Sequence, residues 1–355
     1  MSVNRLSLLR SKMLKENIDA FIINNKANRY YMTGFTGSYG QAVIGVKEQY
    51  IIADGRYFEQ LKKQSPDFTV IDNEMQMIPT IQMLLKKKDY QKVAIESDDM
   101  NVTEYLGLLD KDIELVSTQN WIENQRMIKE PTEIKHIQKA ADITDRTFEH
   151  ILKYMRPGMT ERQVANEIDQ YGISIGADGA AFETIVASGV RSALPHGHAS
   201  DKVIQDHELV ILDFGFLKDK YYSDITRTIA MGNVSSELLE VYQLTLDAQE
   251  LAIAACQVGR KLKEIDATAR NYIAEHGRKE NFLHGTGHGL GLTVHEYPLL
   301  NQDSEEKIQI NMTFTVEPGI YLAQKGGVRI EDDIWIDSNG QAQLMTQSPK
   351  ELLIL

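Results

Sequence analysis

The chain has 355 residues, of which 42% are hydrophobic and 25% charged, and its formal net charge is −13. This length allows two domains with substantial cores, and the acidic balance argues against a nucleic-acid partner, because such partners favour a basic face. No run of about 18 uncharged apolar residues occurs, so we expect no membrane span. The N-terminal stretch is charged throughout and the only cysteine is Cys256. We therefore expect a cytoplasmic protein without a signal peptide or disulfides.

The first third of the chain alternates strand and helix patterns up to about Ser117, which predicts an α/β unit. The opening segment to Glu16 and the stretches RYFEQLKKQ, IPTIQMLLKKK and TEYLGLLDK have helical spacing. Short strands are expected at IDAFII, QAVIGV, QYIIAD, FTVID, KVAIE and IELVS. The glycine-rich TGFTGSYG lacks the lysine of a phosphate-binding loop and is interpreted as a tight connection. We place an N-terminal domain at residues 1–125 and a second domain at 126–355, joined near WIENQRMIKEPTEI.

The second part interleaves long helices with antiparallel hairpins, which predicts an α+β arrangement. Pro131 suits the first turn of a helix that continues to about Met155. Thr160 and Gln163 have the spacing of a capping box at the start of the next helix. Two more helices are expected at SSELLEVYQLTLDAQELAIAAC and KLKEIDATARNYIAEHG.

The stretch VILDFGFLKDKYYSDITRTI, residues 210–229, predicts two strands joined by a polar turn at LKDK. Asp213 lies in the first apolar strand and Asp224 in the second. A hairpin centred between Lys218 and Asp219 would place these carboxylates opposite one another, with Cβ atoms about 5 Å apart. Two like charges this close on a half-buried face are unfavourable unless a cation lies between them.

The stretch TFTVEPGIYLAQKGGVRIEDDIWI, residues 313–336, predicts a second hairpin of the same kind. Centred on Gln324, it would place Glu317 opposite Glu331. The charge of four carboxylates is balanced by two divalent cations, and oxygen ligands suit hard or borderline cations. The alternative is that the acids are unrelated solvated strand residues. Two such pairs on apolar strands favour a two-metal site.

Histidines in glycine-containing loops precede both hairpins in the sequence. His196 lies in ASGVRSALPHGHAS, and His284, His288 and His295 lie in LHGTGHGLGLTVHE. Glycines let the backbone approach a ligand closely. We predict His288 as the nitrogen ligand and His295 as an acid or hydrogen-bond donor near the substrate. A direct role for His284 stays open, and His198 is equally consistent with a surface residue.

The motifs SALPHG, LDFGFLKDKYYSDITRT, GTGHGLGLTVHE, TVEPGIY and GGVRIED occur in this order. Together they resemble the metallopeptidase family that holds aminopeptidase P, prolidase and methionine aminopeptidase. The resemblance extends from about Ile128 to the C-terminus. The N-terminal third looks like the smaller domain of the aminopeptidase P, prolidase and creatinase branch.

This resemblance implies a C-terminal pita-bread domain, as in creatinase and the aminopeptidases, with a smaller N-terminal α/β domain. It implies two divalent metal ions per chain, with manganese expected first and cobalt or zinc as alternatives, and it implies a homodimer. Asp224 and Glu331 would bridge both metals. The remaining site residues would be the ligands Asp213, His288 and Glu317, the substrate-side His196 and His295, and Arg329 beside the metals. Glu317 would also shuttle a proton to the leaving nitrogen.

The implied activity is hydrolysis of the Xaa-Pro bond at peptide N-termini by a hydroxide held between the metals. The expected partner is therefore a small peptide with proline in second position. Prolidases often place an arginine four residues after the histidine that matches His295, and this chain has Leu299 there. Its absence favours aminopeptidase P over an Xaa-Pro dipeptidase, although Lys307 could replace the arginine. The remote alternatives are a creatinase-like amidinohydrolase and a non-catalytic relative, both of which tend to lose metal ligands.

Overall fold

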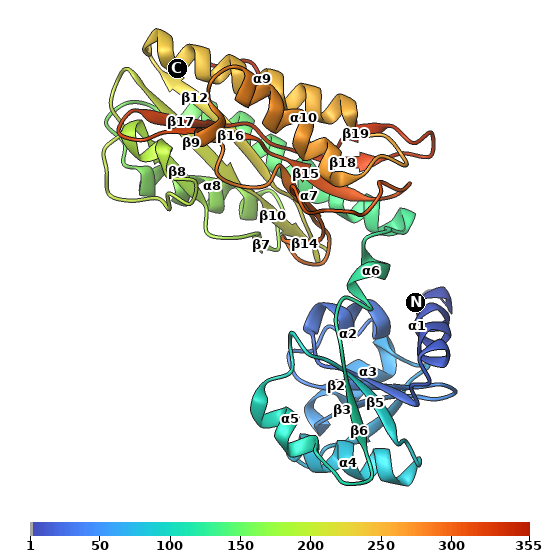
Figure 1. Cartoon of the computed structure of the whole chain (residues 1–355). Helices are drawn as coiled ribbons and strands as arrows, with labels where there is room; N and C mark the ends of the chain where they lie inside the picture. Colours follow the sequence, from blue (N-terminus) through green and yellow to red (C-terminus); the bar gives the residue numbers. More distant parts are fainter. Residues whose placement is uncertain (1–2) are drawn as a thin grey trace. The chain divides into compact units, whose positions relative to one another are not determined.

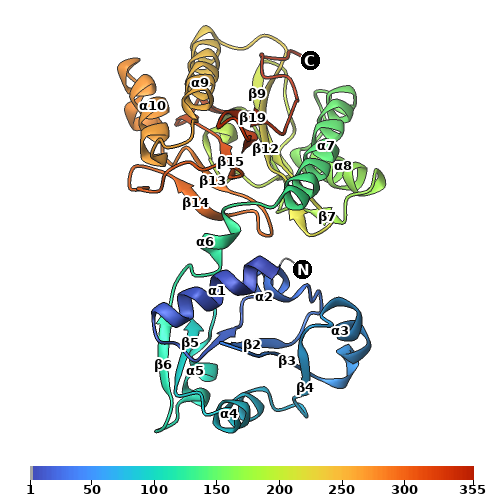
Figure 2. The same ribbon diagram turned by 90° about the vertical axis from the view of Figure 1, so that its right-hand side faces the viewer.

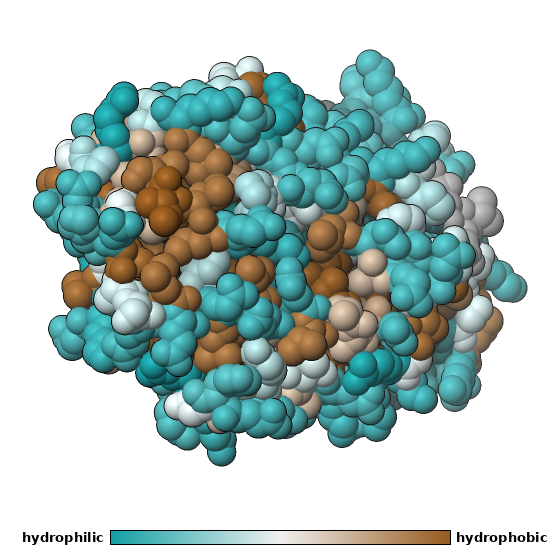
Figure 3. All heavy atoms as spheres, turned by 90° about the horizontal axis from the view of Figure 1, so that it is seen from above, coloured by the Kyte–Doolittle hydropathy of each residue, from teal (hydrophilic) through white to brown (hydrophobic). Residues whose placement is uncertain are grey.

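The computed structural model describes residues 3–355, and its contacts divide the chain into two compact units, Met1–Arg126 and Met127–Leu355 (Figure 1). Within the described residues, no helix combines the length and apolar character needed to cross a bilayer. The face of the molecule in Figure 3 is largely hydrophilic and carries a hydrophobic area toward its left side.

The first unit is a six-stranded sheet in the order β4-β3-β2-β1-β5-β6, with helices packed against it. All six predicted strands are confirmed: β1 (Ala20–Ile23), β2 (Gln41–Gly45), β3 (Gln49–Ala53), β4 (Thr69–Asp72), β5 (Lys92–Glu96) and β6 (Glu114–Thr118). The helices are α1 (Val3–Lys15), α2 (Lys26–Thr33), α3 (Phe58–Gln64), α4 (Met77–Lys87), α5 (Val102–Leu108) and α6 (Glu123–Arg126). The first two residues of the expected opening helix lie outside the described residues.

Helix α2 was not predicted, and it buries the polar Asn28 and Arg29 together with Tyr31 and Met32. Its Arg29 is buried and donates to the carbonyl oxygens of Gly37 and Gly40, which holds the TGFTGSYG connection. The helix starts at Asn25, whose side chain accepts from the Asn28 amide, and it ends at a left-handed glycine.

Four long helices of the second unit match the sequence prediction: α7 (Pro131–Tyr154), α8 (Glu161–Ser174), α9 (Ser236–Ala255) and α10 (Leu262–Glu275). The predicted capping box is present, since the Gln163 amide donates to Thr160 Oγ1 at 3.1 Å and the Thr160 amide donates to Gln163 Oε1 at 2.8 Å. Cys256 follows α9 directly and is buried, as expected for a core residue.

The strands of the second unit lie between the two helix pairs, with α9 and α10 on one side and α7 and α8 on the other (Figure 2). Each pair closes a separate hydrophobic core against a different part of the strands. The main sheets have the orders β12-β9-β8 and β14-β13-β15-β18-β19. The strands are β7 (Gly179–Ala180), β8 (Ile185–Ser188), β9 (Glu208–Phe214), β10 (Phe216–Lys218), β11 (Tyr221–Tyr222), β12 (Ile225–Met231), β13 (Gly287–Gly289), β14 (Glu296–Leu300), β15 (Thr313–Val316), β16 (Gly319–Leu322), β17 (Gly326–Arg329), β18 (Asp332–Ile336) and β19 (Ala342–Leu344).

The first carboxylate hairpin forms, but its predicted register is wrong by two residues. Asp213 pairs with Thr226 rather than with Asp224. The turn is centred between Asp219 and Lys220, whose φ angles of 52° and 75° are those of a two-residue type I′ turn. A shift of two residues leaves each side chain on the same face of the strand, so both carboxylates still face one way.

The second carboxylate hairpin has the predicted register. Val316 pairs with Asp332 and Gly319 pairs with Arg329, so Glu317 and Glu331 lie opposite one another in the gap between two ladders. The two hairpins are joined where the Glu331 amide donates to the Thr226 carbonyl oxygen at 3.1 Å. Residues about 100 positions apart in the chain thereby become neighbours in space.

Candidate active site

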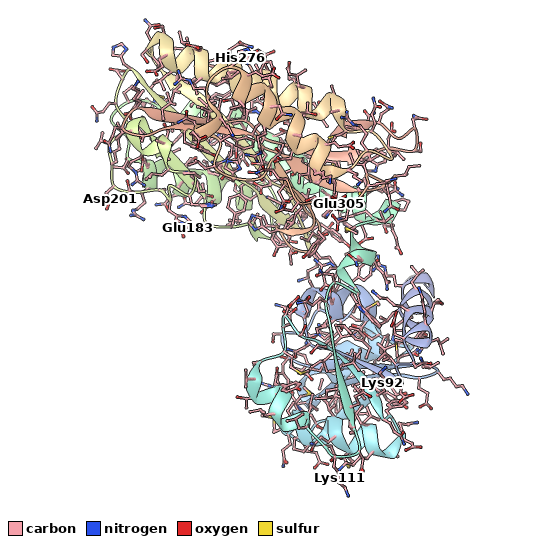
Figure 4. All side chains as sticks on the ribbon, viewed as in Figure 1. Lys92, Lys111, Glu183, Asp201, His276 and Glu305 are labelled. Carbon is pink, nitrogen blue, oxygen red and sulfur yellow. The ribbon has the colours of Figure 1, made fainter. Side chains whose placement is uncertain are left out.

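A cavity of about 460 Å³ in the second unit collects the predicted site residues. Its lining includes Asp213, Asp224, His288, Glu317, Glu331, His196, His295 and Arg329. His284 and His198, whose roles were open, also line it. Figure 4 labels Glu183, which lines the cavity, at the lower edge of this unit, and His276, which does not, at its upper edge.

Close packing of the first hairpin places its two acids in this cavity. A Cβ atom added to Gly215 would lie 1.9 Å from the Ser223 carbonyl oxygen, so only glycine allows the strands to approach this closely. Asp213 and Asp224 are 8% and 4% exposed, and Glu331 from the other hairpin is 2% exposed. The acids are thus largely removed from bulk solvent.

Two buried carboxylate oxygens in this cluster have no hydrogen-bond partner, Asp224 Oδ1 and Glu331 Oε1. The candidate ligand atoms of Asp224, His288 and Glu331 all lie within 4.8 Å of one another. Burial, followed by the charge of Glu331, raises the pKa of Asp224 well above its usual range, and burial likewise raises the pKa of Glu331. Buried carboxylates without partners are costly, and a divalent cation satisfies both. These residues therefore fit a metal centre.

His288 presents a lone pair to the cluster. Its Nδ1 lies 3.1 Å from the Gly289 carbonyl oxygen, which can only accept, so Nδ1 carries the proton and Nε2 is free to ligate. Nε2 lies 3.3 Å from Glu317 Oε1 and 3.8 Å from Asp224 Oδ2. These close contacts do not indicate a protonated ring, because burial lowers the pKa of His288 and raises that of Glu317. The Nε2 atom and the carboxylate oxygens around it are all atoms that can ligate a shared cation.

Arg329 connects the two hairpins at the cavity lining. It donates to Asp213 Oδ2 at 2.5 Å and to the Tyr321 hydroxyl at 2.8 Å. That hydroxyl lies 2.9 Å from His284 Nε2, while His284 Nδ1 lies 2.8 Å from the Gly285 carbonyl oxygen. His284 therefore carries its proton on Nδ1 and accepts from Tyr321, and burial raises the pKa of Tyr321 to about 12.

Tyr321 was missed by the sequence reasoning. The signal that could have found it is a tyrosine on a buried strand of the carboxylate hairpin, four residues after Glu317. The role of Asp213 as a metal ligand stays a prediction. It lines the cavity and one of its oxygens is bound by Arg329, whereas the tight ligand group contains Asp224, His288 and Glu331.

Comparison with known proteins identifies the family. The model of metallopeptidase family M24 matches residues 135–338, and that of the creatinase/prolidase N-terminal domain matches residues 5–128. The chain belongs to metallopeptidase family M24. Its membership implies divalent metal ions at the site.

The relatives described below cover 96–100% of this chain. It is 38% identical to the Xaa-Pro dipeptidase of Pyrococcus horikoshii over 96% of each chain. The solved Xaa-Pro dipeptidase from Bacillus anthracis superposes with a TM-score of 0.97 at 41% identity, covering 100% of both chains. The X-Pro aminopeptidase from Thermotoga maritima gives 0.89 at 35% identity, covering 99% of both. These findings confirm the pita-bread fold and the aminopeptidase P and prolidase branch.

Proposed function

We propose that this protein is a metal-dependent Xaa-Pro dipeptidase. The observation that carries the proposal is the pair of buried, partnerless oxygens on Asp224 and Glu331, two cavity-lining residues whose ligand atoms lie close to those of His288. The relatives named as Xaa-Pro dipeptidases support this reading over the aminopeptidase P reading that the sequence favoured. The Thermotoga relative named as an X-Pro aminopeptidase keeps the second reading as the runner-up.

Five residues would hold two divalent ions, with Asp224 and Glu331 shared between them and Asp213, His288 and Glu317 completing the set. Manganese is our first assignment, and cobalt and zinc are the alternatives. Bound there, the ions would lower the pKa of a shared water toward ~7 and so supply a hydroxide nucleophile at neutral pH. Arg329 would orient Asp213 through its 2.5 Å contact.

The other cavity residues would orient the peptide and move protons. The His295 ring lies 4.3 Å from the His288 ring, centroid to centroid, and burial lowers its pKa, so it acts as a neutral donor. Such a donor would stabilise the oxyanion that forms from the scissile carbonyl. Glu317 lines the cavity beside His288 and would carry a proton to the leaving proline nitrogen. His196 would contact the substrate from the opposite loop.

The cavity also offers an apolar wall for the proline ring. Phe182, Ile185, Pro195 and Leu299 line it. Leu299 is 40% exposed, at the position where an arginine would grip a dipeptide carboxylate. Lys307, considered above as its replacement, is not among the described residues that line this cavity. The carboxylate would therefore meet no guanidinium at position 299, and this feature favours the runner-up, an aminopeptidase that accepts longer peptides.

The test compares hydrolysis of Ala-Pro with that of Ala-Pro-Ala, with added Mn²⁺ and with a chelator. We expect Ala-Pro to be the better substrate and the chelator to abolish both activities. Leu299→Arg should raise kcat/KM for Ala-Pro relative to Ala-Pro-Ala, because a bidentate arginine recognises the terminal carboxylate. Faster cleavage of the tripeptide by the wild type would favour the aminopeptidase. Absence of hydrolysis with every metal would favour a creatinase-like or non-catalytic protein.

A further inference from the structure

A buried ion pair lies outside the cavity lining, directly behind the loop that carries His295. Lys129 Nζ donates to Glu296 Oε1 at 2.8 Å, and the two side chains are 1% and 4% exposed. The partners are 167 positions apart in the chain. Burying two charges carries a large desolvation penalty, so such a pair is weak evidence for stability and requires another explanation.

The glycine-rich loop wraps around this pair. A Cβ atom on Gly291 would lie 2.6 Å from Glu296 Oε1 and 3.1 Å from Lys129 Cε, so the backbone passes the pair as closely as glycine permits. The Thr293 hydroxyl lies 3.3 Å from Glu296 Oε2 and 3.0 Å from the His295 carbonyl oxygen. Thr293 thus links the Glu296 carboxylate to the backbone of His295.

His295 immediately precedes Glu296, and little else orients its ring. Within residues 3–355, no hydrogen bond from the His295 imidazole to another protein group is found, and its ring packs against that of His288. Its position therefore depends on the backbone that the ion pair holds. Lys129 is itself anchored, because its amide donates to the Asn311 carbonyl oxygen at 2.9 Å.

We infer that Lys129 is a positioning residue that, through Glu296, holds His295 at the distance from the metal-binding cluster that catalysis requires. The inference rests on the proposed function. A shift of about 1 Å in a catalytic group can cost up to about 100-fold in rate. Loss of the lysine also leaves the Glu296 carboxylate buried without its counter-ion, which favours rearrangement of the loop.

The test is a double-mutant cycle on kcat/KM for Ala-Pro, using Lys129→Met, His295→Ala and the double variant at full metal content. We expect Lys129→Met alone to lose about 10- to 100-fold, mainly in kcat. In the His295→Ala background, Lys129→Met should cost little more, because its effect acts through that ring. Equal losses in both backgrounds, or no loss in the single variant, would overturn the inference.

Two further measurements separate positioning from folding and from a failed function. Lys202→Met breaks another lysine–carboxylate pair of this unit, at 2.7 Å to Glu208, and should lower the melting temperature without changing kcat. The imidazole NMR signal of His295, assigned by its loss in His295→Ala, should shift or broaden in Lys129→Met and in Glu296→Gln. An unchanged His295 signal in these variants contradicts the inference, whatever the activity of the wild type. Absence of Xaa-Pro hydrolysis by the wild type would refute the proposed function, and this outcome is separate from the NMR result.

Discussion

Replacing Asp224 with asparagine should make the metal-free protein more stable while removing its response to metal. In the structure this carboxyl is 4% exposed, has an oxygen without a partner, and lies near the acidic side chains of Glu331, Asp213, Asp333 and Glu317. An unsatisfied buried polar atom costs about 1–3 kcal/mol. The neutral amide removes the like-charge repulsion and adds a donor within reach of the acidic neighbours.

The expected gain is therefore about 1–3 kcal/mol in the free energy of unfolding of the metal-free protein. For a domain of this size, each kcal/mol moves the melting temperature by about 2–4 °C. The gain should be largest at alkaline pH, where the wild-type carboxyl has lost its proton. With Mn²⁺ at 100 times its Kd, the wild type should gain about 2.7 kcal/mol, and Asp224→Asn should gain much less.

The assay is thermal unfolding at pH 8.5 with EDTA and with Mn²⁺, together with metal analysis and Ala-Pro hydrolysis. Substitution of a residue that only supports a metal ligand typically lowers activity by about 10- to 100-fold. The loss of activity in Asp224→Asn should be larger than this, because the ligand itself is changed. A metal-free Asp224→Asn protein that melts below metal-free wild type would refute the electrostatic reasoning. Two metals per chain and full activity in this variant would refute the site assignment.

Four further outcomes are expected. First, burial raises the pKa of the cluster carboxyls in the metal-free fold, so they keep protons that the unfolded chain loses near ~4. The stability of the metal-free protein should therefore fall as pH rises, and the rise in melting temperature caused by Mn²⁺ should grow from pH 5.5 to pH 8. An equal rise at both pH values would contradict this. Tyr321→Phe removes the hydroxyl that Arg329 binds and should cost about 1 kcal/mol in urea unfolding and lower kcat. Gly215→Ala should cost about 1–3 kcal/mol and reduce metal content, because the Cβ meets the Ser223 oxygen, whereas Gly55→Ala meets no atom within 4 Å and should change neither. Sedimentation should give the mass of a homodimer, and a monomer would contradict the family-based expectation.

The sequence determined the long helices of the second unit, the strands of the first and the metal chemistry of the site, since these depend on local signals. Capping residues, proline at a helix start and short β-rich runs each act over a few positions, and they located the long helices of the second unit and all six strands of the first. The second hairpin was placed correctly because its three-residue turn at 323–325 has one natural centre, Gln324. Acids on apolar strands and histidines among glycines indicated metal chemistry from residue type alone.

Only the tertiary structure decided which of these groups meet. The first hairpin closes at Asp219 and Lys220, two positive-φ residues whose suitability for a type I′ turn is not visible from composition. Arg329 meets Asp213 across 116 positions, and Lys129 meets Glu296 across 167. Local backbone preferences carry no information over such separations, because these contacts arise only when the two hairpins and their loops pack into one core.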